Sequence, residues 1–255
     1  MYIHLFLHGK GGIGKSQMAA ATGDYLMRHG SDVVCVDCDP STDTFRRVTS
    51  LRVQFFDIMN GDEVDSSKFD EMLMAILDSG AQHAVIDSGS GAYRALVDYL
   101  MHSDMLRVLA AEGHPAFLHT VLAGGGQMTT TVDGFHKLVE CFPEGDFVVW
   151  LNPKEGPLVH QGVHVVQHED FERYSHLVRS VIEVPQLNKG TFMKDLSRLL
   201  AQGQTFADAQ ADRGTNFIVK NRLRQLQQMF DALLDQALLE LGALNIAGGR
   251  ALSAE

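Results

Sequence analysis

The residues best suited to chemistry lie in the string HGKGGIGKSQ, residues 8–17 of the 255-residue chain. The string contains the spacing G-x-x-x-x-G-K-[ST], follows a short apolar run and precedes an alanine-rich segment. Strand, glycine loop and helix in this order form a phosphate cradle, because glycines let successive N–H groups turn toward one anion at the positive end of the helix. The residues expected to bind phosphate are Gly9, Lys10, Gly11, Gly12, Ile13, Gly14, Lys15, Ser16 and Gln17.

Two members of this string have side chains with a specific chemistry. Lys15 is expected to reach the terminal phosphates of a nucleotide, and the Ser16 hydroxyl to complete the ligand shell of a magnesium ion. The alternative is a glycine-rich connector without a ligand, which the strand and helix signals on either side disfavour. The pattern therefore predicts a nucleotide phosphate site and leaves the base open.

Carboxylates follow two further apolar runs of the kind that form buried parallel strands. The run VVCV leads into Asp37 and Asp39, and the run AVI leads into Asp87. Because ligands of open α/β sheets lie at the carboxyl ends of the strands, these acids are expected near the phosphates. Buried acids are costly without a cation, so Ser16, Asp37 and Asp87 are the predicted magnesium ligands. For Asp39 the alternative is a turn residue that binds its own backbone.

Apolar runs and helical stripes alternate along most of the chain. Residues 116–122, 147–151 and 180–184 have the character of strands, and the segments between them have apolar residues at helical spacing. This repetition predicts an α/β fold with a mostly parallel twisted sheet and helices on both faces. We expect one domain, residues 1–255, with a long amphipathic helix at 216–241 and a flexible tail at 243–255. That helix is expected to pack on the sheet, with a partner surface as the alternative.

The composition limits the functional classes. A formal net charge of −11 excludes bulk coating of nucleic acid, and the small basic patches at 46–52 and 220–224 are expected on solvated faces. Three cysteines suit a reducing compartment, and Cys35 and Cys38 are expected to be packing residues, because no second C-x-x-C pair follows. No apolar run could span a bilayer and no leader pattern is present, so a cytoplasmic protein without membrane insertion is expected.

The string GKGGIGKS, with a second lysine near its start, resembles the deviant Walker A motif of the ParA/MinD class of ATPases. The resemblance implies ATP as ligand, and a homodimer in which Lys10 reaches the phosphates bound by the partner subunit. A matching D-x-D-P string implies that Asp39 positions or activates the attacking water. Asn152 and Pro185, which follow two later strands, are implied to frame adenine. The alternatives are loop capping for Asn152 and Pro185, and an exposed loop residue for Lys10.

Longer strings resemble plasmid-encoded members of this class that act in conjugal transfer. They are IHLFLHGKGGIGKS, FFDIMNGDEVDSSKFD, VIDSGSGAYRALVDYL and VVWLNPKEGP, and the likeness runs from the first strand to about residue 210. The resemblance implies a role in conjugative DNA transfer or its secretion apparatus, with proteins of that machinery as partners. Ser41 stands where many partition ATPases have glutamine, which departs from typical ParA proteins and leaves direct DNA binding open.

The leading hypothesis is a magnesium-dependent ATPase that dimerises around ATP and turns over slowly, as a switch. Lys10 and Asp39 are its predicted catalytic residues. The alternatives are a ParA-like partition or positioning ATPase, a metabolic ligase or kinase of the same fold, and a nucleotide-binding adaptor that hardly turns over. A ligase or kinase needs an acceptor pocket beside the γ-phosphate, and no set of residues in the sequence is assigned to one.

Overall fold

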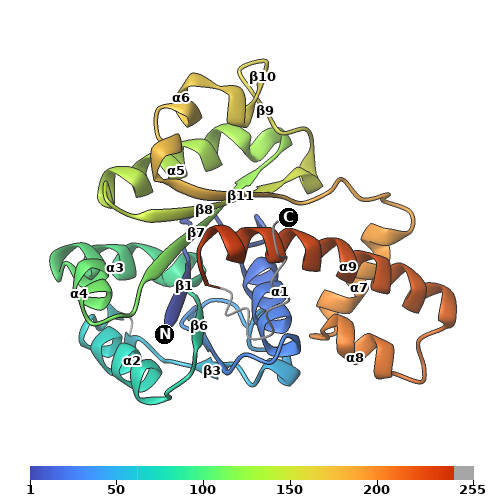
Figure 1. Cartoon of the computed structure of the whole chain (residues 1–255), viewed down its shortest axis with the longest axis horizontal. Coiled ribbons are helices and arrows are strands. Elements are labelled where there is room, and N and C mark those ends of the chain that lie inside the picture. Colours follow the sequence, from blue (N-terminus) through green and yellow to red (C-terminus); the bar gives the residue numbers. More distant parts are fainter. Residues whose placement is uncertain (62, 244–255) are drawn as a thin grey trace, which may run out of the picture.

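The protein is built on a parallel β-sheet, which we describe from a computed structural model that covers residues 1–61 and 63–243. Within these residues the largest sheet has seven strands in the order β11-β8-β7-β1-β6-β2-β3, and every neighbouring pair is parallel (Figure 1). Its strands are β1 (Tyr2–Phe6), β2 (Val33–Asp37), β3 (Gln54–Phe55), β6 (His83–Asp87), β7 (Ala116–Ala123), β8 (Asp146–Asn152) and β11 (Val178–Glu183). The predicted α/β fold with a parallel sheet is therefore confirmed.

Helices follow the strands and cover both faces of the sheet, as parallel strands require for their crossovers. They are α1 (Lys15–Arg28), α2 (Ser67–Asp78), α3 (Gly89–His102), α4 (Met105–Ala111), α5 (Met128–Cys141), α6 (Glu169–Glu172), α7 (Phe192–Ala201), α8 (Phe206–Ala211) and α9 (Phe217–Glu240). Two small antiparallel hairpins, β4 (Met59–Asn60) with β5 (Glu63–Val64) and β9 (Val159–His160) with β10 (Val163–His164), lie outside the main sheet.

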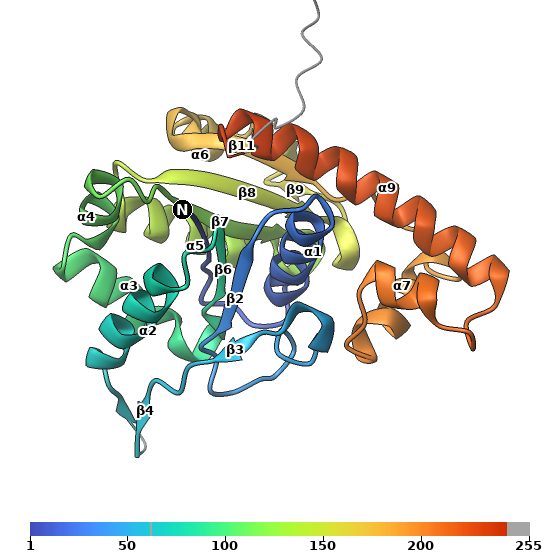
Figure 2. The same cartoon turned by 60° about the horizontal axis from the view of Figure 1, so that its bottom comes forward.

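Two hydrophobic cores lie on opposite faces of the sheet. The first contains apolar residues of α2, α3 and α5, among them Phe69, Leu96 and Phe135. The second contains Leu26 of α1 and Leu226 of α9, together with residues from the other sides of the same strands. Figure 2 shows α1 and α9 together on their side of the sheet. Because the central strands are covered on both faces, they need apolar residues in continuous runs, which is the pattern that identified them.

The long helix α9 packs on the sheet rather than standing free (Figures 1 and 2). It begins after Asn216, whose side chain accepts a hydrogen bond from the Val219 N–H at 3.0 Å. Arg28 of α1 makes an ion pair with Asp231 of α9, with 2.6 Å between Nη2 and Oδ1. The prediction that its apolar stripe packs on the sheet is therefore confirmed. Residues 244–255 of the predicted tail lie outside the described residues.

No described helix combines the length and the apolar character needed to cross a bilayer.

Candidate functional site

The glycine loop connects β1 to α1 at the carboxyl edge of the sheet. Gly12 and Gly14 have φ values of 78° and 100°, in the left-handed region that favours glycine. A Cβ on Gly14 would lie 2.8 Å from Asn152 Nδ2, so the loop also needs glycine there for space. Among the described residues no side chain caps the start of α1, which leaves N–H groups of its first turn for an anion. Ser16 lies in that first turn.

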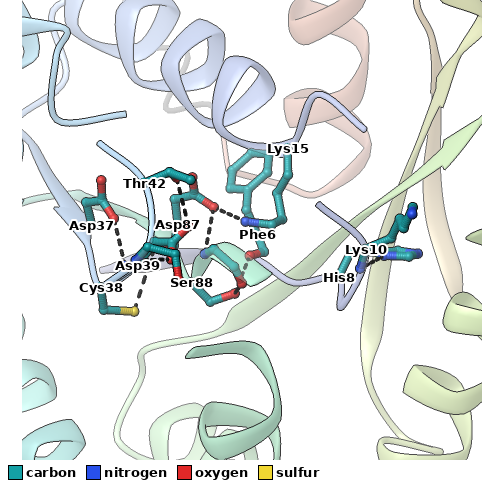
Figure 3. Close-up of polar contacts among 12 residues, drawn as sticks. Phe6, His8, Lys10, Lys15, Asp37, Cys38, Asp39, Thr42, Asp87 and Ser88 are labelled. Atoms are coloured by element: carbon teal, nitrogen blue, oxygen red, sulfur yellow. Dashed lines mark hydrogen bonds and ion pairs between the residues drawn. The ribbon is translucent and has the colours of Figure 1, made fainter. Parts of the chain in front are cut away.

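Lys15 is buried and makes an ion pair with Asp87, the last residue of β6 (Figure 3). Asp87 also accepts a hydrogen bond from the Gly89 N–H at 3.3 Å. Both side chains are shielded from water, and each buried charge needs a partner of opposite sign. The structure thus brings together the predicted phosphate lysine and one predicted magnesium ligand, and a terminal phosphate would offer Lys15 a second anion.

Asp37 lies beside Asp87, because the ends of β2 and β6 are neighbours in the sheet register. Burial, together with the nearby negative charge of Asp87, raises the pKa of Asp37 to about 6. The opposing cation is Arg46, which forms a long ion pair with 3.9 Å between its Nε and Asp37 Oδ2. A carboxylate whose pKa stays raised beside such a cation is one that a divalent ion would stabilise.

Asp39 is buried and serves the turn that follows β2. Its Oδ1 accepts the Ser41 N–H at 2.9 Å and its Oδ2 accepts the Thr42 hydroxyl at 2.8 Å (Figure 3). It also packs against Gly89, where a Cβ would lie 1.9 Å from the Asp39 carboxyl carbon. The turn interactions expected under the alternative reading are therefore present, and they hold the carboxylate beside the loop that follows β6.

Asn152 and Pro185 line the same cavity of about 330 Å³, which also reaches Gln17 in α1. Its deeper wall is apolar and comes from α7, α8 and α9. Asn152 Nδ2 donates to the Ile13 carbonyl at 2.9 Å, and its Oδ1 accepts the Lys154 N–H at 3.1 Å. The structure thus places both predicted base-binding residues at one cavity and shows that Asn152 also holds the glycine loop and caps the turn after β8.

Lys10 is separated from this group. Its side chain is half-buried and points away from Lys15 and the carboxylates (Figure 3). It lines a second, smaller cavity of about 140 Å³, between the glycine loop and the segments that follow β7 and β8. Its backbone N–H donates to His8 Nδ1 at 2.9 Å.

His8 and Arg46 are site residues that the sequence reading did not single out. His8 stands directly before the glycine motif, and this adjacency was the one signal available for it. Arg46, placed in a solvated basic patch by the sequence, lies over the Phe55 ring at 3.9 Å and faces Asp37. Its side chain is about one quarter exposed, so Arg46 lies at the edge of the expected solvated face and contacts the site.

Comparison with known proteins first defines the class. The model of the 4Fe-4S iron sulfur cluster binding proteins of the NifH/frxC family matches residues 3–76. The ParA family ATPase from Chlorobium tepidum superposes with a TM-score of 0.54 at 16% identity, over 92% of this chain and 98% of that one. The MinD cell division protein from Aquifex aeolicus gives 0.52 at 16%, over 89% and 98%. These structural matches, both at 16% identity, show that the chain has the fold of these proteins, with its glycine loop between β1 and α1.

The narrower relationship comes from sequence. Protein TraL of Escherichia coli is 36% identical over 236 residues, which are 92% of this chain and 98% of that protein. A second Escherichia coli Protein TraL is 34% identical over the same shares. The chain belongs to the TraL family.

An iron–sulfur cluster does not fit the residues present. A cluster is held by four thiolates, supplied by one chain or shared between two, and the cysteines of this chain are Cys35, Cys38 and Cys141. Cys35 and Cys38 are both buried, and burial raises the pKa of the Cys35 thiol to about 12, so neither offers a thiolate at neutral pH. Among the described residues no three His, Cys, Asp or Glu side chains gather as a metal site. The prediction that the C-x-x-C pair packs in the interior is confirmed by its burial.

Proposed function

We propose that the protein is a cytoplasmic, magnesium-dependent ATPase of plasmid conjugal transfer that dimerises around ATP and turns over slowly, as a switch. The observation that carries the proposal is the separation of two lysines in one loop. Lys15 is buried against Asp87, whereas Lys10 points away from both (Figure 3). A lysine that served only its own nucleotide would lie beside Lys15. An outward lysine suits contact with the nucleotide of a second subunit, where it would stabilise charge on the transferring phosphoryl group.

Within one subunit, Lys15 would exchange Asp87 for the terminal phosphates. Asp87, released from the ion pair, would then be available to a magnesium ion together with Asp37 and Ser16. The residues fit this ion, since the two aspartates are register neighbours and the pKa of Asp37 is raised. Bound magnesium supplies charge neutralisation on the phosphate oxygens, and proteins hold it with one or two carboxylates plus those phosphates.

Asp39 would orient the attacking water. Its two oxygens each accept one hydrogen bond from the turn, and an ionised carboxylate has further lone pairs for another donor. Because the turn holds it against Gly89, the carboxylate would be fixed before the water arrives. Asn152 and Pro185 would frame adenine at the mouth of the larger cavity. Partners would be a second copy of the chain and proteins of the conjugation machinery.

The test compares Lys10→Ala with the native chain by ATP affinity and by molecular mass in solution with ATP and magnesium. We expect unchanged ATP binding by the monomer and a dimer weakened by about tenfold or more, because the missing cation acts across the interface. Lys137→Ala removes an exposed lysine of α5 and serves as the matched control. Undiminished ATP-dependent dimerisation of Lys10→Ala, or a native chain that stays monomeric with ATP, would refute the proposal.

A further inference from the structure

We propose that His8 is a positioning residue for Lys10: its ring holds the Lys10 backbone in the conformation from which Lys10 reaches the nucleotide of a partner subunit. This inference rests on the proposed dimer and assigns a residue to it. Lys10 stands between Gly9 and Gly11, which restrict the backbone less than any other residue type. An ordered Lys10 therefore needs a restraint from outside its own neighbours.

The hydrogen bonds of His8 supply that restraint and fix its tautomer. The Lys10 N–H can only donate, so Nδ1, 2.9 Å away, is the acceptor and carries no proton. The proton is then on Nε2, which donates to the Thr131 carbonyl of α5 at 3.3 Å. One neutral tautomer thus satisfies both contacts and joins the glycine loop to a helix more than a hundred residues later. Burial lowers the pKa of His8 to about 4, with Lys15 as a further cause, so the neutral form is present at physiological pH.

The helix that receives His8 has space for the ring. Gly134 lies in the interior of α5, where glycine costs about 1 kcal/mol relative to alanine. A Cβ at this position would lie 2.7 Å from His8 Nε2. Gly134 therefore leaves the volume that the imidazole occupies, and a side chain there would push the ring from its two partners.

The same turn of α5 is itself fixed to the sheet. The Thr131 hydroxyl accepts the N–H of Ala123, the last residue of β7, at 3.1 Å and donates to the Gln127 carbonyl at 3.0 Å. His8 is thus held by a helix that is itself hydrogen-bonded to the neighbouring strand. The position of Lys10 is therefore fixed relative to the sheet and not by the loop alone.

Two amide variants separate the contacts of the ring. In His8→Asn the side-chain oxygen can replace Nδ1 as acceptor for Lys10, but the side chain is too short for Thr131. In His8→Gln the amide reaches the place of Nε2 and can donate to Thr131, but it has no acceptor near Lys10. We expect His8→Gln, which loses the Lys10 contact, to weaken ATP-dependent dimerisation by about tenfold or more, and His8→Asn, which loses only the anchor to Thr131, to weaken it by less. ATP affinity of either monomer should stay within about threefold.

Hydrogen exchange of the Lys10 amide provides a readout that does not depend on the dimer. Its protection should persist in His8→Asn and fall in His8→Gln, and Gly134→Ala should behave as His8→Gln does. Thermal unfolding of each variant checks that it folds. If the two amide variants protect the Lys10 amide equally, or dimerise equally while the native chain dimerises, the proposed role of His8 is overturned and the proposed function stands. A native chain that stays monomeric with ATP overturns the proposed function, and the role of His8 with it.

Discussion

The middle of the sheet and its carboxyl edge both contain buried polar groups, but those in the middle are neutral and those at the edge are charged. Across four adjacent strands runs what we call the histidine row: Trp150 and the rings of His119, His4 and His83. At the carboxyl edge of the sheet lie the side chains of Asp37, Asp39 and Asp87, which we call the carboxylate edge. The members of the row are joined by hydrogen bonds between neutral groups, whereas the edge has more negative charge than the cations beside it can balance.

The histidine row has one hydrogen-bonding direction. The Trp150 indole can only donate, so His119 Nδ1 accepts at 3.0 Å and His119 Nε2 donates to His4 Nδ1 at 3.0 Å. His4 Nε2 then donates to His83 Nδ1 at 3.2 Å. Every ring is neutral in this arrangement, and burial lowers the pKa of His119 to about 3, that of His83 to about 4 and that of His4 well below its usual value.

The carboxylate edge differs from the histidine row because its side chains are charged. Lys15 neutralises Asp87, but Asp37 keeps a raised pKa beside its long ion pair with Arg46, and Asp39 is held by neutral donors. Buried polar groups that are neutral and hydrogen-bonded to one another need no ligand, whereas buried groups with excess negative charge are stabilised by a cation. The histidine row is therefore part of the structural interior, and the carboxylate edge is a candidate cation site.

Acid should break the histidine row, with the largest expected effect on stability. The unfolded chain takes up protons on these three rings below about pH 6.5. In the folded chain the pKa values of His83 and His119 are about 4 and about 3, and that of His4 is also lowered, so stability falls as the pH falls. At about 1.4 kcal/mol per pH unit for each ring, the free energy of unfolding should drop by up to about 6 kcal/mol from pH 6.5 to pH 5. Chemical denaturation across this range measures it.

His83→Asn sharpens the same prediction. The amide oxygen can take the place of Nδ1 as acceptor for His4, and one titrating ring is removed. We expect the acid-induced loss of unfolding free energy to shrink by about 1 to 2 kcal/mol. His102→Asn, at an exposed histidine, is the control and should leave the slope unchanged. An unaltered slope in His83→Asn would show that its protonation is not what the acid acts on.

At the carboxylate edge, Lys15→Met should have the next largest effect. The variant keeps the apolar stem but leaves Asp87 buried without its cation and removes the phosphate contact. ATP affinity should fall by about 1000-fold, and the unfolding free energy by about 3 kcal/mol, within the range for a broken buried pair. Calorimetric titration with ATP and magnesium tests the first value. Near-native ATP binding would contradict the assignment of Lys15.

Asp39→Asn tests hydrolysis with less disturbance. The amide oxygen can still accept one hydrogen bond from the turn, while the negative charge is lost. We expect phosphate release to slow by about 10² to 10³-fold, with ATP binding and dimerisation retained. Phosphate release in the presence of ATP and magnesium, without any added substrate, is the measurement. Turnover at the native rate would show that Asp39 only stabilises the turn after β2 and does not act in hydrolysis.

The sequence predicted the edge of the sheet better than its middle, for a physical reason. Phosphate loops and strand-end carboxylates are local patterns, so Lys15, Asp37 and Asp87 could be placed together at the carboxyl edge of a parallel sheet. Strand runs at 116–122 and 147–151 were located within a few residues for the same reason. The histidine row is invisible to such reasoning, because each bond joins residues 31 to 115 positions apart and no local pattern encodes the partner.

Asn152 lies between these two cases, and the smallest predicted effect decides its role. Its position after a strand suggested adenine binding, yet both ends of its amide already bind the Ile13 carbonyl and the Lys154 N–H. If it serves mainly to hold the glycine loop, Asn152→Ser should weaken ATP and GTP equally, by about three- to tenfold, because each shares the phosphates. If it reads the base, only ATP affinity should fall. The ratio of the two dissociation constants, compared with that of the native chain, therefore distinguishes a residue that shapes the phosphate loop from one that selects its nucleotide.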